Sequence, residues 1–323
     1  MSAEKATTSE QIAIGVAHSK LILIGEHAVV HGQPAIALPF PLVGVESVID
    51  YAPGKVKIDS TFYHGPIDAA PESLEGIVNC IKATLNHLHL PCEDMLIRIK
   101  SSIPPGKGLG SSASVAIAVI KSLFSYFDRG YTEEELLELA NISETYAHGV
   151  PSGIDTMTIT SESPVWYEKE QPIELINPKG DFHFIVADSG RVGDTRLAVE
   201  SVASLFKSAP RRIQAKLDRI GELTHRARNA LESASKHLLG QMLNEAQKEL
   251  EALGVSDAGL NRLIYFARQE GALGAKLTGG GNGGCIIALA RNEVHSRQLA
   301  EKLKKFGAHA VWPFVLRRKS EKL

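Results

Sequence analysis

The sequence predicts an α+β fold in two domains. Its 323 residues are more than one hydrophobic core usually organises. Hydrophobic residues make up 44% and charged residues 22% of the chain, which is typical of globular proteins. Extended and helical patterns alternate without strict βαβ order, which favours α+β layering over a doubly wound parallel sheet. The break at "INPKGD" predicts domains spanning 1–180 and 181–323.

Charge and cysteine content limit the classes of function. The net charge of −2 argues against a nucleic-acid binder, which usually carries a basic stripe. Cys80, Cys92 and Cys285 match no metal or CxxC spacing and are expected to be free thiols in a reducing cytoplasm. The polar start "MSAEKATTSE" is not a signal peptide, and no apolar run reaches the ~18 residues of a membrane span. We therefore expect a cytoplasmic protein without membrane or nucleic-acid partners.

The first domain combines strands with helices. The segments "GVAHSKLILIG", "HGQPAIALPF", "VGVESVIDY" and "DMLIRIKSSI" are predicted as strands, separated by Gly and Pro. Apolar residues at helical spacing predict a helix in "ESLEGIVNCIKATLNHL" and another from about 111 to 127. A capping box of Thr132 and Glu135 starts the next helix, which His148 and Gly149 end. "VPSGIDTMTIT" is expected to be a turn, and Trp166 lies in a later strand.

The second domain opens with the strand "FHFIVADSG". Four helices are predicted at about 194–208, 210–236, 238–253 and 256–270. In "GALGAKLTGGGNGGCIIALA", glycines separate two short extended segments. A helix at about 292–306 and the strand "HAVWPFVL" complete the domain.

The stretch "PPGKGLGSSASVAIAVIKSLF", residues 104–124, places glycines and serines directly before a helix. The first N–H groups of a helix lack internal partners, and the helix dipole favours an anion there. Gly106, Gly108 and Gly110 let the backbone approach a ligand closely. The segment therefore predicts phosphate binding, and the alternative is a glycine turn with a serine N-cap.

Two other glycine motifs are not supported. A Walker A loop requires G-x-x-x-x-G-K-[ST], which "GKGLGSSAS" does not match. Gly279, Gly281 and Gly284 form a G-x-G-x-x-G pattern, but "CIIALA" after it is typical of a strand, whereas a dinucleotide fingerprint opens a helix.

Three motifs together resemble the family of kinases named for galactokinase, homoserine kinase, mevalonate kinase and phosphomevalonate kinase. They are "KLILIGEHAVVHGQPAIALP", "PPGKGLGSSAS" and "KLTGGGNGGC", in the family's order and spacing. "HGVPSGIDT" and "LLGQMLNEAQKELEALGVSDAGLNRLI" are similar to the branch that phosphorylates the 5-hydroxyl of (R)-mevalonate for isoprenoid synthesis. The resemblance implies a small-molecule kinase fold, with an N-terminal domain like domain 2 of ribosomal protein S5 and a ferredoxin-like C-terminal domain.

The resemblance also assigns the ATP and Mg²⁺ sites. Phosphoryl transfer requires positioning, neutralisation of phosphate charge and help for the attacking hydroxyl. Ser112 and Glu144 match the family's Mg²⁺ ligands. The ATP phosphates are expected along Pro105, Gly106, Lys107, Gly108, Leu109, Gly110, Ser111, Ser112, Ala113 and Ser114.

Asp155 and Lys20 match the family's catalytic pair. Asp155 is expected to accept the proton of the substrate hydroxyl, and a nearby ammonium of Lys20 keeps this carboxylate charged and stabilises the transferring oxygens. Without the motif, an aspartate after Gly-Ile is more often a turn residue, and Glu144 more often an exposed helix carboxylate.

The expected substrate-binding residues are Lys20, Glu26, His27, Asp155, Thr195 and Gly281. His27 is interpreted as a pocket or structural residue and not as a base. Thr195 has an N-cap role as its alternative. The third glycine loop, Gly279 to Gly284, is expected to pack against the first.

Two positions depart from the family pattern, Lys107 before Gly-Leu-Gly and Asn282 in the third motif. Two other functions are considered. A sister kinase for phosphomevalonate or another small alcohol would share the ATP site, but a phosphorylated acceptor needs more basic residues than the sequence offers near Asp155. A non-catalytic sensor is expected to lack Lys20, Ser112, Glu144 or Asp155, and all four are present. Members of the family that the chain resembles often form homodimers, but the sequence locates no dimer interface and does not give the oligomeric state.

Overall fold

The computed structural model describes residues 13–148 and 153–318. Within these residues the chain divides into two compact units. The first unit contains residues 13–19, Val43–Ile103, and 111–156 as far as these are described. The second contains Lys20–Leu42, Pro104–Gly110 and residues 157–318. Strands β1 (Ala13–Ile24) and β2 (Ala35–Lys55) therefore each contribute residues to both units. The boundary predicted at residue 180 stays a prediction.

The first unit is built on a sheet with one buried face. Its strands run in the order β4 (His64–Pro66), β3 (Lys57–Ser60), β5 (Glu93–Ser101) and the second part of β2, with which β1 also pairs. β2 and β5 are antiparallel, whereas β3 and β5 are parallel. Met95, Ile97 and Ile99 are buried and alternate with partly or fully exposed residues, so one face of β5 is buried.

Three long helices supply the rest of this core. They are α1 (Glu75–His87), α2 (Ser111–Tyr126) and α3 (Glu133–His148), and the short helices η2 (Ile67–Ala69) and η3 (Glu72–Leu74) precede α1. The predicted capping box of α3 is confirmed. Glu135 N–H donates to Thr132 Oγ1 at 3.1 Å, and Thr132 N–H donates to Glu135 Oε2 at 2.7 Å. The backbone N–H of Thr132 is the main cause that lowers the pKa of Glu135.

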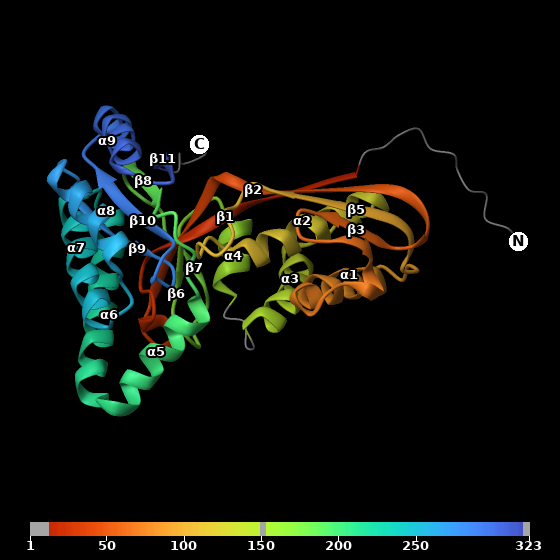
Figure 1. The fold of residues 1–323 in the computed structure, drawn as a ribbon, viewed down its shortest axis with the longest axis horizontal. Coiled ribbons are helices and arrows are strands. Elements are labelled where there is room, and N and C mark those ends of the chain that lie inside the picture. Colours follow the sequence, from red (N-terminus) through yellow and green to blue (C-terminus); the bar gives the residue numbers. More distant parts are fainter. Residues whose placement is uncertain (1–12, 149–152, 319–323) are drawn as a thin grey trace, which may run out of the picture. The chain divides into compact units, whose positions relative to one another are not determined.

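The second unit contains a four-stranded antiparallel sheet in the order β11-β8-β10-β9 (Figure 1). Its strands are β8 (Phe182–Asp188), β9 (Gly274–Thr278), β10 (Cys285–Ala290) and β11 (Ala310–Leu316). In chain order this is 4-1-3-2 with helices after the first and third strands, which is the ferredoxin-like arrangement. The predicted ferredoxin-like C-terminal domain is confirmed.

Helices cover one face of this sheet. The helices α7 (Lys236–Ala252), α8 (Ala258–Gln269) and α9 (Glu293–Phe306) pack directly against the sheet, whereas α6 (Pro210–Glu232) packs against α7 and α5 (Thr195–Ser208) packs against α6. Ile185 and Ile286 of the sheet belong to one buried cluster with Leu217, Leu260 and Leu299 of the helices. Smaller elements of the unit are η1 (Ala28–His31), β6 (Val165–Tyr167) and β7 (Glu174–Leu175); β6 pairs with the first part of β2.

Most predicted helices lie within two to four residues of the observed ones, because strong 3.6-residue periodicity was present in each. Two predictions of local structure were wrong. The segments predicted as two strands around Pro39 and Pro41 form one long strand, β2. The described part of "VPSGIDTMTIT" forms helix α4 (Ile154–Thr160) and not a turn, while residues 149–152 lie outside the described residues.

The capping box gives a stability prediction. Thr132→Ala removes the oxygen that accepts from the Glu135 N–H, and we expect a loss of about 1 kcal/mol in the free energy of unfolding. Urea unfolding followed by circular dichroism measures the loss. Thr145→Ala in the same helix is the control, because the exposed Thr145 hydroxyl only donates to the Asn141 carbonyl. A loss as large for Thr145→Ala would show that the cap is not the cause.

Candidate active site

The first glycine loop, Pro104–Gly110, lies in the second unit with Lys20. Gly106, Gly108 and Gly110 have φ values of 67°, 72° and 71°, which favour glycine. Lys20 is buried, and its backbone N–H donates to the Leu109 carbonyl at 3.3 Å. A Cβ at Gly110 would lie 2.8 Å from Cγ of Lys20. Lys20 therefore lies directly along the end of the loop, just before α2 begins.

The third glycine loop packs against the first, as predicted. A Cβ at Gly108 would lie 3.2 Å from Cα of Gly279, so the two backbones are in close contact. Lys107 does not extend into solvent, because its ammonium contacts Asp188 Oδ1 at 2.8 Å and donates to the Arg191 carbonyl at 2.8 Å. An interaction of residue 107 with ATP would therefore come from its backbone.

Helix α2 starts at Ser111, so the N–H groups of Ser111, Ser112 and Ala113 have no partner within the helix. Ser112 is partly exposed. Ser114 is fully buried, and its hydroxyl donates to the His18 carbonyl at 2.9 Å. The serines of the motif thus differ, since Ser114 is buried and joins α2 to β1 while Ser112 is partly exposed.

Glu144 and Asp155 lie on neighbouring helices of the first unit. The hydroxyl of Thr156 donates to Asn141 Oδ1 at 3.1 Å and so joins the start of α4 to α3. Asn141 and Glu144 are three residues apart and share one face of α3, and Asp155 is adjacent to Thr156. Glu144 is 5% exposed, which excludes the interpretation as an exposed helix carboxylate. Among the described residues, no group of three or more His, Cys, Asp or Glu side chains could hold a metal ion.

Glu26 forms a buried ion pair with Lys276 on β9. The Glu26 side chain is 2% exposed and the Lys276 side chain 0%. Lys276 also donates to the Leu277 carbonyl at 2.5 Å. Burial raises the pKa of Glu26 and lowers the pKa of Lys276, and the charge of each partner opposes the shift of the other. Glu26 Oε2 has no hydrogen-bond partner among the described residues.

His27 is held by the third glycine loop. Its Nε2 lies 2.9 Å from the Gly280 carbonyl, which can only accept, so Nε2 carries the proton and Nδ1 is an acceptor. Nδ1 is buried and has no hydrogen-bond partner among the described residues. Burial lowers the pKa of His27, which favours the neutral ring. The hydroxyl of Thr278 adds a further link by donating to the Ile22 carbonyl at 2.8 Å.

Thr195 and Gly281 lie in or beside the third loop. Thr195 is exposed, and a Cβ at Gly280 would lie 2.8 Å from its Cα. The alternative role of Thr195 as an N-cap is wrong, because Asp194 caps α5 by accepting from Leu197 N–H at 3.0 Å. Gly281 is buried, and a Cβ there would lie 1.9 Å from the Val255 carbonyl oxygen, so only glycine fits.

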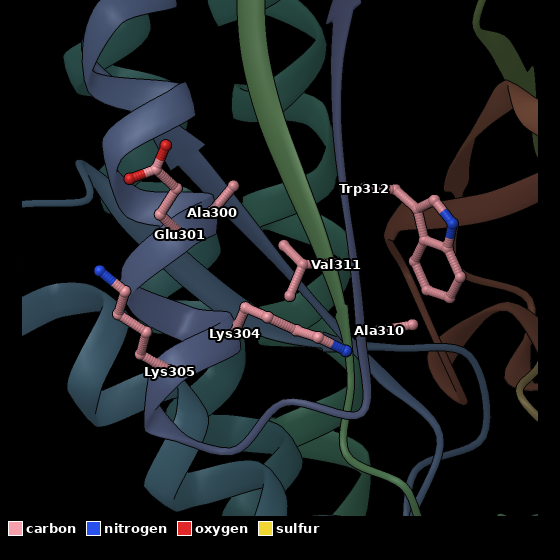
Figure 2. A pocket seen from close by; sticks show the side chains of 7 residues that line it. All are labelled: Ala300, Glu301, Lys304, Lys305, Ala310, Val311 and Trp312. Atoms are coloured by element: carbon pink, nitrogen blue, oxygen red, sulfur yellow. The ribbon is translucent and has the colours of Figure 1, made fainter.

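The predicted residues thus fall into two groups. Lys20, Glu26, His27, Thr195 and the two glycine loops gather in the second unit, whereas Ser112, Glu144 and Asp155 belong to the first. A hollow between α9 and β11 includes none of them (Figure 2). It is lined by Ala300, Glu301, Lys304, Lys305, Ala310, Val311 and Trp312. The glycine loops, and not this hollow, are therefore the candidate site.

Sequence reasoning missed Lys276 and Asp188 as partners in this site. Each lies in a strand that is otherwise apolar, "AKLT" and "FIVAD". A charged residue inside a buried strand requires a partner, which is a usable signal. The partner itself is not visible, since 250 residues separate Lys276 from Glu26.

Comparisons with known proteins show the family of the chain. The family described as GHMP kinases N terminal domain matches residues 75–162, and GHMP kinases C terminal matches residues 227–309. A mevalonate kinase of Pyrococcus abyssi is 32% identical over 318 residues, covering 92% of this chain and 93% of that protein. The chain belongs to the mevalonate kinase family.

Solved mevalonate kinases share the whole fold. A structure from L. major in complex with R-mevalonate has a TM-score of 0.82 at 25% identity and covers 99% of this chain and 100% of its own. A mevalonate kinase structure from Methanococcus jannaschii has a TM-score of 0.79 at 25% identity, and the match covers 97% of this chain and 100% of that chain. The two-domain kinase fold predicted from the motifs is thereby confirmed.

The buried ion pair of this family member gives a second stability prediction. Lys276→Met leaves the Glu26 carboxylate buried without a cation, and we expect a loss of about 3–5 kcal/mol in the free energy of unfolding. Urea unfolding measures it. Lys302→Met is the control, because the Lys302–Glu270 pair is largely exposed and is worth about 1 kcal/mol or less.

The double variant Glu26→Gln/Lys276→Met checks the cause. It removes both charges, so it should regain part of the lost stability. If the free energy of unfolding of the double variant were lower than that of Lys276→Met by about another 3–5 kcal/mol, the loss would reflect packing and not the lone charge.

Proposed function

We propose that the chain transfers the γ-phosphoryl group of ATP to the 5-hydroxyl of (R)-mevalonate, giving 5-phosphomevalonate and ADP. The observation that carries the proposal is the first glycine loop. It is held backbone to backbone on the third loop, with Lys20 against its last glycine, directly before the N-terminus of α2. Membership of the mevalonate kinase family supports the identity of both substrates.

The glycine loop is proposed to bind the phosphates of ATP. Along residues 105–114, the backbone N–H groups that follow Pro105 interact with phosphate oxygens, and the positive end of the α2 dipole adds to the attraction. Side-chain contacts are fewer than the sequence suggests. The Lys107 ammonium and the Ser114 hydroxyl already have protein partners, which leaves Ser111 and Ser112 as the side-chain donors.

Asp155 and Lys20 are proposed as the catalytic residues. As the oxygen of the 5-hydroxyl bonds to the γ-phosphorus, the bond from that phosphorus to the β–γ bridging oxygen breaks and ADP leaves. The Asp155 carboxylate accepts the proton of the hydroxyl. The Lys20 ammonium stabilises the charge on the transferring oxygens.

Ser112 and Glu144 are proposed to hold Mg²⁺. A hydroxyl and a carboxylate in one unit are hard oxygen donors, and Mg²⁺ usually takes only one or two ligands from protein. Glu144 is 5% exposed, which fits a ligand position and not an exposed helix carboxylate. When bound, the ion neutralises charge on the β- and γ-phosphates.

The residues proposed to bind the acceptor are Lys20, Glu26, His27, Asp155, Thr195 and Gly281. Glu26 Oε2 and His27 Nδ1 support this, because buried acceptors without a protein donor are expected to meet a ligand donor or water. Thr195 offers an exposed hydroxyl beside Gly280. Burial lowers the pKa of His27, which disfavours a permanent positive charge on its ring.

The reaction is proposed to take place in the cytoplasm on a small-molecule acceptor. All three cysteines are free, which is typical of a reducing cytoplasm. None of the helices in the described ranges has the length and hydropathy to cross a bilayer. The net charge of −2 favours a small-molecule acceptor over nucleic acid. A sister kinase for phosphomevalonate is not favoured by the family membership.

ADP release from Mg-ATP across a panel of acceptors tests the function. Turnover with mevalonate, and none with phosphomevalonate, homoserine or galactose, is the expected result. Equal turnover with phosphomevalonate would favour the sister kinase. ATP binding without turnover on any acceptor would favour a sensor.

Asp155→Asn tests the base. We expect kcat to fall by about 100-fold or more, because an amide cannot accept the hydroxyl proton, while ATP binding measured by calorimetry stays close to the wild-type value. Asp128→Asn, at an exposed position where φ is 52°, is the matched control. Retention of most activity by Asp155→Asn would remove the proposed role.

Glu144→Gln tests the metal site. We expect the Mg²⁺ concentration for half-maximal activity to rise about tenfold, equivalent to about 1.4 kcal/mol, because the variant loses a charged oxygen ligand. Glu138→Gln, exposed on the same helix, is the control. An unchanged Mg²⁺ requirement in Glu144→Gln would exclude Glu144 as a ligand.

A further inference from the structure

Three loops of the second unit meet at Lys107, a residue that departs from the family pattern. Its side chain is 6% exposed, and that of Asp188, at the end of β8, is 1% exposed. The Lys107 ammonium contacts Asp188 Oδ1 and the Arg191 carbonyl, both at 2.8 Å. We call Lys107, Asp188 and the Arg191 carbonyl the Lys107 latch. It joins the first glycine loop to the loop that follows β8.

Backbone hydrogen bonds continue the latch into the third glycine loop. The Arg191 carbonyl that accepts from Lys107 also accepts from Gly284 N–H at 2.8 Å. Gly193 N–H donates to the Gly106 carbonyl at 2.9 Å. Asp188 Oδ1 also accepts from Gly190 N–H at 2.8 Å, which fixes the turn that presents the Arg191 carbonyl. One buried ammonium therefore lies at the junction of all three loops.

A loop with three glycines does not maintain a single backbone conformation by itself. Glycine has more backbone freedom than any other residue, so ordering such a loop at the moment of binding costs free energy. A ligand binds more tightly when that ordering is already complete. The Lys107 latch holds the loop in one conformation, because separating the buried ammonium from the carboxylate would leave two unpaired buried charges.

We propose that Lys107 is a positioning residue, which holds the first glycine loop ready for ATP and does not itself contact phosphate. The inference rests on the proposed function, in which this loop binds ATP. It differs from the expectation for a lysine in a phosphate loop, whose ammonium binds phosphate oxygens directly. The two roles predict opposite effects of removing the Asp188 carboxylate. If Lys107 positions the loop, ATP binding should weaken when the carboxylate is lost. If Lys107 binds phosphate directly, loss of the carboxylate should release its ammonium for the phosphate.

The test compares Lys107→Met, Asp188→Asn and the double variant with the wild type. Calorimetry measures the Kd for Mg-ATP without acceptor, and thermal unfolding gives Tm in parallel. We expect each single variant to weaken ATP about tenfold, and the double variant to weaken it no further, since both changes open one latch. In turnover with mevalonate, the KM for ATP should rise by a larger factor than kcat falls.

The double variant separates positioning from general stability. A single variant leaves one buried charge alone and should lower Tm, whereas Lys107→Met/Asp188→Asn leaves none and should regain part of it. ATP binding should stay weak even where Tm recovers. Lys216→Met, which breaks the Lys216–Glu249 pair between α6 and α7 in the same unit, is the matched control and should bind ATP normally.

Two results would overturn the inference. Normal or tighter ATP binding by Asp188→Asn, with weak binding by Lys107→Met, would show that Lys107 contacts phosphate directly. Normal binding by the double variant would show that the loop needs no latch. A wild-type protein that did not bind ATP would instead contradict the proposed function itself, so the two failures are distinguishable.

Discussion

The buried ion pair between Glu26 and Lys276 fixes the arrangement on which the other contacts of the second unit depend. Removing two charges from water is costly, so the pair is retained for the one arrangement that it selects and not for net stability. Any shift of the loop after β1 relative to β9 would leave two lone buried charges. With the pair in place, His27 reaches the Gly280 carbonyl and Thr278 reaches the Ile22 carbonyl. Segments more than 250 residues apart in the chain are thereby held together.

Charged side chains in this unit therefore serve mainly to hold loops, and the backbone is left to meet the ligand. Lys107 and Lys276 are both buried cations, and each is committed to a carboxylate and a carbonyl. Besides Lys20, which is proposed as catalytic, the groups of this unit that are proposed to meet a ligand are main-chain N–H groups of the first loop and the acceptors on Glu26 and His27. Such a site can bind phosphates tightly without any side chain that must reorganise during the reaction, which is the condition for electrostatic preorganisation.

Much of this fold could be predicted from the sequence, because its helices carry strong periodicity and its caps are local. The Thr132–Glu135 capping box and the helix after Pro210 depend only on neighbouring residues. The errors arose where tertiary contacts override local signals. Pro39 and Pro41 suggested a strand break, yet β2 is continuous through both. The roles proposed for Ser112, Glu144 and Asp155 rest on motif likeness. The partners of Glu26 and Lys107 could not be predicted, since nothing local in a sequence specifies which distant charge will be buried beside another.

The two departures from the family pattern have physical reasons in the structure. Asn282 has a φ of 50°, in the left-handed region that asparagine tolerates better than other residues with a Cβ, and its N–H donates to the Val255 carbonyl at 2.8 Å. The side chain is exposed, so a residue other than glycine fits there. Lys107 is different, because its side chain is buried and paired. The exposed Asn282 side chain is compatible with the fold without any partner. The buried Lys107 ammonium requires a partner, and Asp188 supplies the carboxylate that pairs with it.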